Sequence, residues 1–307
     1  MAIADPQVGT IAPGMDVGPG EGILDVHEAR PLRADIIKRF LRNKLAIAGL
    51  AFLFLLAVAA IFAPLIAPYE YAERTAQFRA PPSSEHLFGT DTIGRDIFSR
   101  VVFGARVSLK IGTLATLLML FIGVTFGAVA GFFGGATDTL MMRITDIFLS
   151  IPYIVLAIAI ATIFGRSENS IILVLGLTGW LAISRIVRSS FLGLKELEYV
   201  ESAHAQGFTK RRIMFRHVLP NAMQPIIVFG TVSIGSVILS EAALSFLGVG
   251  PQSPTPAWGL MVAEAGAGSL TSAPHMLFFP GLAIFLTVLA FVLVGDGLRD
   301  ALDPRLK

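Results

Sequence analysis

Long stretches without a single charged residue are the feature that most constrains this chain of 307 residues. A helix that crosses a bilayer needs about 20 mostly apolar residues, because each residue rises about 1.5 Å through a hydrocarbon core of roughly 30 Å. Charged residues make up only 15% of the chain, against about 25% in a soluble protein. This composition argues against a soluble enzyme and predicts that lipid replaces water as the outer solvent.

Six apolar segments of suitable length predict six transmembrane helices. The predicted spans lie within residues 45–63, 111–137, 147–165, 171–186, 222–246 and 277–294. The fourth span carries Arg185 near its end, where a long basic side chain can reach the membrane interface. The expected fold class is therefore an all-α, polytopic membrane protein.

Lysine and arginine residues are distributed unevenly between the predicted loops. Six spans place both termini on one side of the membrane, and 17 of the 24 basic residues fall on that side. Because loops rich in lysine and arginine remain in the cytoplasm, both termini are predicted to be cytoplasmic. Membrane orientation also accounts for the basic pI of about 9.0 without any binding of nucleic acid.

The segments outside the spans have distinct predicted roles. Residues 1–30 are expected to form a disordered cytoplasmic tail, and residues 31–44 a basic amphipathic helix at the lipid surface. A long outer loop is predicted at 64–104. A core of five helices follows at 105–298, and a second cytoplasmic tail at 299–307.

Several kinds of chemistry have no support in this sequence. The chain contains no cysteine, so a disulfide, a thiolate metal site and a cysteine nucleophile are all excluded. It contains no Gly-x-x-x-x-Gly-Lys-Ser/Thr loop of the kind that holds nucleotide phosphates. We therefore expect neither an enzyme nor a metal site, and we expect any ATP to be bound by another chain.

The segment at 195–220 combines small residues, a glycine and a basic amphipathic helix. A helical run of small residues precedes Gly207, and a basic helix is predicted to follow it and to end at Pro220. Gly207 can adopt the positive φ of a turn between the two helices. Taken alone, these features favour an ordinary basic cytoplasmic loop.

The same segment resembles the cytoplasmic signature of the integral membrane subunits of bacterial ABC importers. That signature is Glu-Ala-Ala, three residues, Gly, nine residues, Ile, one residue and then Leu-Pro. The residues that match it are Glu201, Ala203, Gly207, Leu219 and Pro220, whereas Ser202 and His217 depart from it. The resemblance implies two coupling helices that transmit closure of the ATP-binding subunit. The residues implied in this contact are Glu201, Ala203, Ala205, Gly207, Phe208, Leu219 and Pro220.

The resemblance extends over most of the chain from about residue 35 to residue 307. Segments at 89–109, 243–248, 254–259 and 295–304 look like those of the dipeptide, oligopeptide and nickel permease group, and of its C-type permease. The implied fold is that of a type I ABC importer permease. The residues with expected structural roles in the outer loops are Asp91, Gly94, Arg95, Asp96, Arg100, Arg106 and Trp258. A buried ion-pair network among Arg95, Asp96, Arg100 and Arg106 is preferred over direct contact with cargo.

The resemblance implies a permease that moves peptides across the bacterial cytoplasmic membrane by alternating access. The implied partners are a second permease, two ATP-binding subunits that hold ATP and Mg, an extracytoplasmic substrate-binding protein and membrane lipid. This chain itself is expected to bind no cofactor. Two alternatives remain open: an ion-coupled secondary transporter, and an ABC importer of a nickel chelate or a glutathione-like cargo.

Two groups of charged residues near the span ends allow more than one interpretation. Asp138, Arg143 and Asp146 either contact the ATP-binding subunit or are interfacial charges at helix ends. Glu241 and Glu264 either line the pore or lie in the aqueous outer region, since carboxylates at membrane depth are costly.

Overall fold

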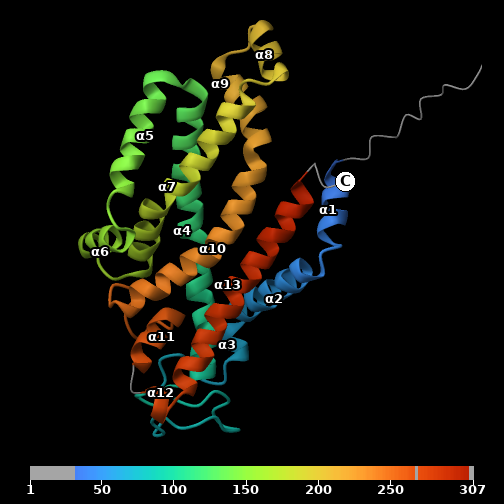
Figure 1. The fold of residues 1–307 in the computed structure, drawn as a ribbon. Helices are drawn as coiled ribbons and strands as arrows, with labels where there is room; N and C mark the ends of the chain where they lie inside the picture. The colour runs from blue at the N-terminus through green and yellow to red at the C-terminus, as the bar shows by residue number, and fades with distance from the viewer. Residues whose placement is uncertain (1–31, 267–268, 304–307) are drawn as a thin grey trace, which may run out of the picture.

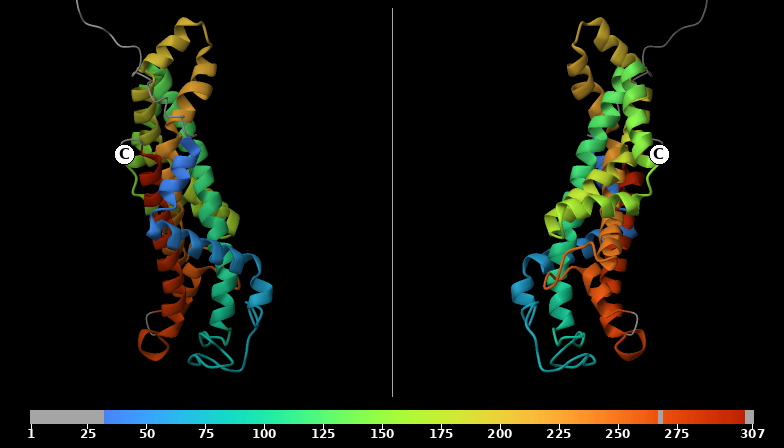
Figure 2. Two further views of the ribbon diagram at one scale, coloured as in Figure 1. Left: turned by 90° about the vertical axis from the view of Figure 1, so that its right-hand side faces the viewer. Right: turned by 90° about the vertical axis from the view of Figure 1, so that its left-hand side faces the viewer.

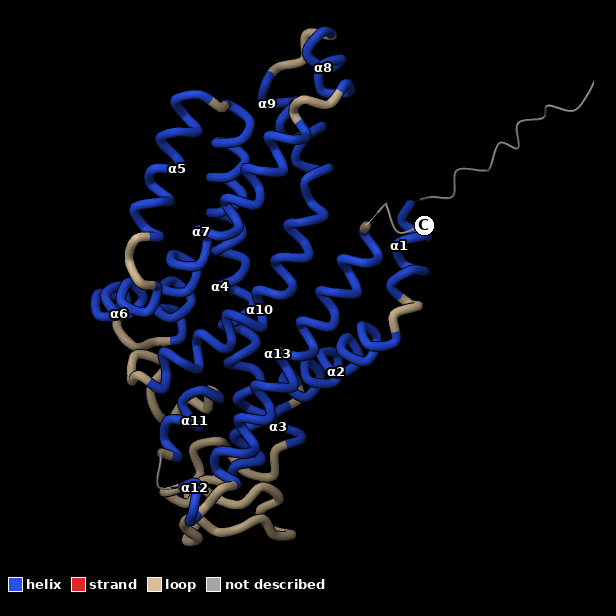
Figure 3. Tube along the Cα trace, in the orientation of Figure 1, coloured by secondary structure: helices blue, strands red, loops and turns tan. Residues whose placement is uncertain are grey.

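The computed structural model describes residues 32–266 and 269–303, and within these residues helices form without any β-strand (Figures 1 and 3). Five helices are long and apolar enough to cross a membrane, and a sixth crossing results if one bent pair counts as a single span. The all-α, multi-span prediction is confirmed. The tail predicted at 1–30 lies outside the described residues.

The described helices fall into three groups. The long apolar helices are α2 (Lys44–Ile61), α4 (Ile97–Phe133), α7 (Glu168–Leu194), α10 (Met223–Phe246) and α13 (His275–Leu302). The bent pair consists of α5 (Gly135–Leu149) and α6 (Tyr153–Phe164). The shorter helices are α1 (Leu32–Phe40), α3 (Ala63–Ile66), α8 (Glu198–Ala205), α9 (Lys210–Ile213), α11 (Trp258–Ala265) and α12 (Ser269–Ser272).

Helices α4 and α7 form the most extensive helix pair of the bundle. Three glycines spaced four residues apart make this possible: Gly123, Gly127 and Gly131 lie on one face of α4. A Cβ atom on any of them would collide with the backbone of α7. In a membrane, where no hydrophobic effect drives apolar helices together, such close backbone contact stabilises helix pairs.

The third predicted span is not a single helix. The chain turns by 89° between α5 and α6, so the apolar stretch at 147–165 divides into two pieces. Pro152 stands at the break and disfavours the helical conformation of the residue before it. Most of α5 lies before the predicted start of the span, because the helix begins at Gly135.

Loops gather at one end of the elongated bundle, and α8 and α9 protrude at the other (Figures 1, 2 and 3). We name these the loop end and the α8 end. The loop end contains residues 67–96 together with α11 and α12. Helix α4 begins at Ile97, inside the loop predicted at 64–104, and α13 continues to Leu302, past the predicted start of the C-terminal tail at 299.

Candidate functional site

The segment at 195–220, here named the coupling segment, forms the protruding tip at the α8 end (Figure 1). Helix α7 ends at Leu194, α8 follows after three residues, and α9 leads the chain back toward the bundle. Two buried side chains of α8, Val200 and Ala203, pack in the same apolar cluster as Ile213 of α9. That cluster also contains side chains of α4, α7 and α10, so the tip is a helix-turn-helix unit whose buried side chains extend the apolar core of the bundle.

Gly207 closes α8 with a left-handed turn. Its φ is +78°, and its N–H donates to the carbonyl of His204 at 2.9 Å while the N–H of Phe208 donates to that of Ala203 at 3.2 Å. This pair of hydrogen bonds is the Schellman arrangement that ends many helices at glycine. A Cβ atom at Gly207 would meet no atom within 4 Å, so the constraint on this position comes from the backbone alone.

The structure divides the seven predicted contact residues by exposure. Glu201, Ala205, Gly207 and Pro220 are exposed, and Phe208 and Leu219 are half-buried. Ala203 is only 3% exposed, so its side chain faces the core of this chain and does not reach a partner. The expectation that Ala203 itself lies in a partner's groove is therefore corrected: Ala203 supports α8 from within.

Phe208 connects the turn to the returning helix. The guanidinium carbon of Arg212 lies 4.2 Å from the centre of the Phe208 ring, and the His217 ring stacks on it at 5.7 Å. A cation over an aromatic face is attracted by the ring quadrupole. These contacts give His217, which departs from the family signature, a structural place in the segment.

The helix predicted to end at Pro220 does not end there. A π-helix, η1 (Met214–Val218), and a 3₁₀-helix, η2 (Leu219–Ala222), carry the chain from α9 into α10. In the π segment the N–H of Leu219 donates to the carbonyl of Met214, and Asn221 Nδ2 donates to the carbonyl of His217 at 2.6 Å. This change of hydrogen-bond register accommodates the missing N–H of Pro220, so α9 and α10 form one helical path.

Two ion pairs join α5 to α7 near the α8 end. Arg188 donates to Asp138 through Nη2 at 2.6 Å and through Nε, and Arg185 Nη2 donates to Asp146 at 2.7 Å. Asp138 is 17% exposed and Asp146 is 49% exposed. These carboxylates hold two helices of the bundle together, which agrees with the interpretation as charges at helix ends.

A buried cluster of four charged side chains organises the loop end. Asp91 accepts from Arg95 Nε and from Arg100 Nη1, both at 2.6 Å, and Glu264 lies 2.6 Å from Arg95 and 2.8 Å from Arg100. The side chains are 6%, 3%, 1% and 21% exposed for Asp91, Arg95, Arg100 and Glu264. We name this set the ion-pair cluster. It joins the 67–96 loop to α4 and α11.

The pKa of Asp91 is below its ordinary value. Desolvation favours the neutral acid, but the backbone N–H of Arg95, the Arg100 guanidinium and the backbone N–H of Ile93 together outweigh it. The carboxylate is therefore ionised at neutral pH, as a pair with two arginines requires.

Two of the residues predicted for this network lie elsewhere. Asp96 caps the start of α4 by accepting from the Ser99 N–H at 2.8 Å, and its other oxygen lies 3.0 Å from His86 Nδ1. Arg106 donates to the carbonyls of Ala60 and Ile61 at the end of α2, both at 2.9 Å. Both residues connect helices to loops, but neither belongs to the ion-pair cluster.

Gly94 and Trp258 complete the loop end. Gly94 takes a φ of +83°, and a Cβ atom there would collide with the carbonyl of Thr75. Trp258 is fully buried at the start of α11 and donates from Nε1 to the carbonyl of Val101 at 2.9 Å. Glu241, in contrast, is 1% exposed inside α10 and accepts from Ser245 at 2.6 Å, so neither the pore nor the aqueous region surrounds it in this structure.

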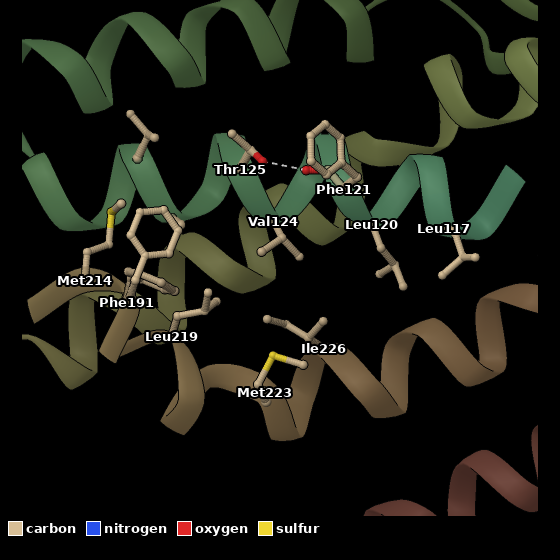
Figure 4. Close-up of a pocket in the computed structure, with 13 residues that line it drawn as sticks. Leu117, Leu120, Phe121, Val124, Thr125, Phe191, Met214, Leu219, Met223 and Ile226 are labelled. Atoms are coloured by element: carbon tan, nitrogen blue, oxygen red, sulfur yellow. Dashed lines mark hydrogen bonds between the residues drawn. The ribbon is translucent and has the colours of Figure 1, made fainter. Parts of the chain in front are cut away.

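An apolar groove of about 420 Å³ runs between α4, α7 and α10 (Figure 4). Leu117, Leu120 and Val124 form its α4 side, and Met223 and Ile226 lie opposite. The only hydroxyl in its wall, that of Thr125, donates to the carbonyl of Phe121 at 2.7 Å. The groove therefore offers a polar ligand only the lone pairs of this one hydroxyl. In the described part of the chain, no group of three or more His, Asp or Glu side chains is arranged to hold a metal ion.

Comparison with known proteins places this architecture in a family. Residues 123–307 match the family model described as "Binding-protein-dependent transport system inner membrane component", and residues 32–82 match the "N-terminal TM domain of oligopeptide transport permease C". The dipeptide transport system permease protein DppC of Alkalihalophilus pseudofirmus is 46% identical, with 89% of this chain and 90% of that protein covered. The oligopeptide permease OppC of Bacillus subtilis is 43% identical over the same shares of the two chains. The glutathione permease GsiD of Pectobacterium atrosepticum is 45% identical, with 88% and 90% covered.

A solved structure shares the fold. An inward-facing form of the MetNI methionine ABC transporter matches with a TM-score of 0.57 and 18% identity, over 67% of this chain and 98% of that one. The sequence match over almost the whole chain, together with this shared fold, shows that the chain belongs to the family of binding-protein-dependent transport system inner membrane components, the permease subunits of ABC importers.

Proposed function

We propose that this chain is the C-type permease of an ATP-driven importer in a bacterial cytoplasmic membrane, with peptides as its cargo. The observation that carries the proposal is the protruding coupling segment, whose Glu201 and Gly207 are exposed at the tip of a compact helix-turn-helix unit. A peptide cargo is supported by relatives named for dipeptide and oligopeptide transport.

The partners follow from this assignment. A second permease completes the translocation pathway, two ATP-binding subunits with ATP and Mg dock on coupling segments, and an extracytoplasmic binding protein delivers cargo at the loop end. Seven basic residues between Arg185 and Arg216 lie in or beside the coupling segment, which supports a cytoplasmic α8 end and cytoplasmic termini. ATP hydrolysis belongs to the partner subunits.

The continuous helical path from α9 to α10 is the element that transmits the movement in this mechanism. Closure of the ATP-binding subunits displaces α8 and α9, and η1 and η2 carry that displacement into α10 without a break in the helix. ATP thereby stabilises one of two arrangements of the transmembrane helices, and its hydrolysis returns the other. Cargo moves because the two arrangements open to opposite sides.

Reconstitution tests this proposal directly. The chain is purified with its partner subunits, placed in proteoliposomes with the binding protein, and supplied with radiolabelled dialanine, pentaalanine or glutathione. We expect uptake of the alanine peptides that requires ATP and persists when a protonophore collapses the proton gradient. Uptake that ignores ATP and follows the gradient would identify an ion-coupled transporter instead.

The probes also separate the alternative cargoes. The GsiD relative, named for glutathione transport, makes glutathione the second candidate. ATP-dependent uptake of glutathione with no uptake of either alanine peptide would replace the peptide assignment while preserving the permease assignment. Uptake of radiolabelled nickel only in the presence of a chelator would do the same for a nickel chelate.

A further inference from the structure

A cavity of about 260 Å³ beside α10 has four hydroxyl-bearing residues among the ten that line it. Ser233, Ser236 and Ser240 recur along α10 at the spacing of one helix face, and Tyr153 of α6 also lines the cavity. Ser236 and Tyr153 are exposed, and Ser240 is partly exposed. Among the described residues that line this cavity, none carries a charge at neutral pH. We name it the hydroxyl chamber.

The break between α5 and α6 lies directly beside the hydroxyl chamber. Ser150, Ile151 and Pro152 form the break, all three are exposed, and the next residue is the lining residue Tyr153. Non-helical backbone at membrane depth is tolerated only where protein covers it or where it borders a water-filled cavity. The break near the middle of the bundle (Figures 1 and 3) is therefore an independent indication that water or a protein partner, and not lipid, faces this chamber.

A second cavity, of about 420 Å³, lies nearer the α8 end of the same helix. Its polar lining consists of Gln224 from α10 and of Asp296 and Arg299, which are exposed and three residues apart on α13. A charge of each sign in one cavity suits the charged ends of a zwitterion. We name it the ionic chamber.

Phe229 and Val232 line both chambers and thus form the apolar boundary between them. Val232 sits against Gly295 of α13, where a Cβ atom would collide with its side chain. From Gln224 in one chamber to Ser240 in the other, α10 rises about 24 Å, which approaches the roughly 30 Å of a bilayer core. The two chambers and their boundary therefore extend along α10 over most of the membrane thickness.

We propose that these two chambers are this chain's part of the cargo path, joined through a constriction at Phe229 and Val232, and that the hydroxyl chamber binds uncharged polar groups such as peptide amides. The proposal rests on the import function proposed above and names the residues that meet the cargo. Serine and tyrosine hydroxyls both donate and accept hydrogen bonds, as peptide N–H and C=O groups require. Ser240, for example, donates to the Ser236 carbonyl at 2.9 Å and keeps its lone pairs to accept.

The apolar groove between α4, α7 and α10 provides the internal contrast (Figure 4). It has the same volume as the ionic chamber, about 420 Å³, yet the Thr125 hydroxyl is the only polar side-chain group among its described lining residues. A peptide that entered this groove would lose hydrogen bonds to water and could regain at most those to the lone pairs of this one hydroxyl, at a cost for each unpaired group. Polar cargo is therefore expected to enter the two chambers and not the apolar groove.

Thiol labelling tests water access to the hydroxyl chamber. Because the chain contains no cysteine, each introduced cysteine is its only thiol. Ser236→Cys and Ser240→Cys are compared with Leu239→Cys, which lies at the same depth, is 56% exposed and lines neither chamber. In the assembled transporter in nanodiscs, a membrane-impermeant maleimide is expected to modify the first two and to spare Leu239→Cys. Equal modification of all three, or of none, would overturn the proposal.

Transport kinetics test binding in the same chamber. Removing one hydroxyl, in Ser236→Ala or Ser240→Ala, is expected to raise the KM for dialanine about two- to tenfold, the effect of one lost hydrogen bond. Leu239→Ala is the matched control and is expected to keep the wild-type KM. An unchanged KM in the double variant Ser236→Ala with Ser240→Ala would overturn the assignment.

Failure of this inference is separable from failure of the import function. If the wild-type complex imports dialanine with ATP while the serine variants match Leu239→Ala, the function stands and the chamber assignment falls. If no ATP-driven uptake occurs but the two serine positions are selectively labelled, the chamber is a water-filled site and the cargo assignment falls.

Discussion

At the loop end, four charged side chains are almost entirely buried and neutralise one another, whereas at the α8 end the charged side chains of the coupling segment are exposed. Asp91, Arg95 and Arg100 are at most 6% exposed, while Glu201 and Lys210 face solvent. The charged groups of the loop end are therefore paired within the chain, although His86 Nε2 and Arg100 Nε are buried without a hydrogen-bond partner among the described residues. The α8 end leaves its charged groups available, which is what a surface for a partner protein requires.

The two ends also differ in their backbone conformation and in the contacts that hold it. The loop end has irregular backbone, but ion pairs, a capping aspartate and the buried Trp258 fix it in one arrangement. The α8 end is mostly helical, and its buried side chains Val200, Ala203 and Ile213 continue the apolar cluster between α4, α7 and α10. The loop end is therefore held largely by polar contacts, and the α8 end by its continuity with the apolar core of the bundle.

The largest difference between the ends is expected on removal of a buried charge. Arg100→Met leaves two carboxylates, Asp91 and Glu264, to share the single guanidinium of Arg95, and removing one partner of a buried ion pair costs about 3–5 kcal/mol. Lys110→Met is the matched control, because Lys110 is 48% exposed in its pair with Glu168, and such a pair contributes less than about 1 kcal/mol. Thermal unfolding of the purified complex measures both. Similar melting temperatures for the two variants would show that the cluster is not what stabilises the loop end.

A second prediction concerns the turn at the α8 end. Gly207→Val forces a β-branched residue to a φ of +78°, which costs about 1–2 kcal/mol or more in a left-handed conformation. We expect membrane insertion to persist and ATP-driven transport to fall about five- to thirtyfold, in proportion to that cost. Uptake of dialanine and ATP hydrolysis are measured together in proteoliposomes.

Two controls show whether the effect belongs to the coupling segment. Gly207→Asn tolerates positive φ better than valine does and should retain most transport. Gly165→Val imposes the same substitution at a φ of +84°, also with no atom near a new Cβ, but after α6. If Gly165→Val impairs transport as much as Gly207→Val, the loss reflects general strain and not coupling.

A smaller effect is expected where α5 meets α7. Asp138→Asn replaces a two-point contact with Arg188 by a neutral one, and we expect a loss of about 1 kcal/mol. Asp146→Asn is the control, because its pair with Arg185 is about half exposed on both sides. Differential scanning calorimetry of the two variants and of the wild type measures the loss of stability in each variant. A greater loss in Asp146→Asn would contradict the ranking by burial.

The smallest effect near neutral pH is expected for acidification. The pKa of Asp91 lies below the ordinary value of 3.8, so its stabilising contribution is complete above that value and is lost as the pH falls through the lowered pKa. The contribution of Asp91 to the melting temperature should stay constant from pH 7 to pH 5 and decline only below about pH 4. If the melting temperature already declines above pH 5, and this decline is absent in Asp91→Asn, then the pKa of Asp91 is raised and not lowered.

Five of the six predicted spans correspond to long apolar helices, and the sixth crossing exists only if the bent pair α5–α6 counts as one span. These spans were predictable because charge is so costly in lipid that its absence marks the membrane segments. The division of the third span was also signalled, by Pro152 within the apolar stretch, but hydropathy alone does not register a bend. The prediction that the helix ends at Pro220 was wrong. A proline normally ends a helix, but here the π-helical hydrogen bonds that precede Pro220 allow the helix to continue.

The partners within each site were harder to predict than the sites themselves. Asp91, Arg95 and Arg100 lie close in sequence, but Glu264 joins them from 169 residues beyond Arg95, and no local pattern reveals a pair at that separation. Ala203 matched the family signature by spacing, yet spacing does not state which side of a short helix faces the core. The serines at 233, 236 and 240 did carry a signal, the period of one helix face, which became meaningful only beside Tyr153.

The unbroken helical path from Lys210 to Phe246 has a geometric consequence. Its 37 residues make an arm of about 55 Å, at 1.5 Å per residue. A tilt of only about 5° about its α9 end displaces the far end of such an arm by about 5 Å, nearly one helical turn. In the import function proposed above, a small tilt imposed by a docked partner would therefore displace the far end of this arm by the length of a side chain.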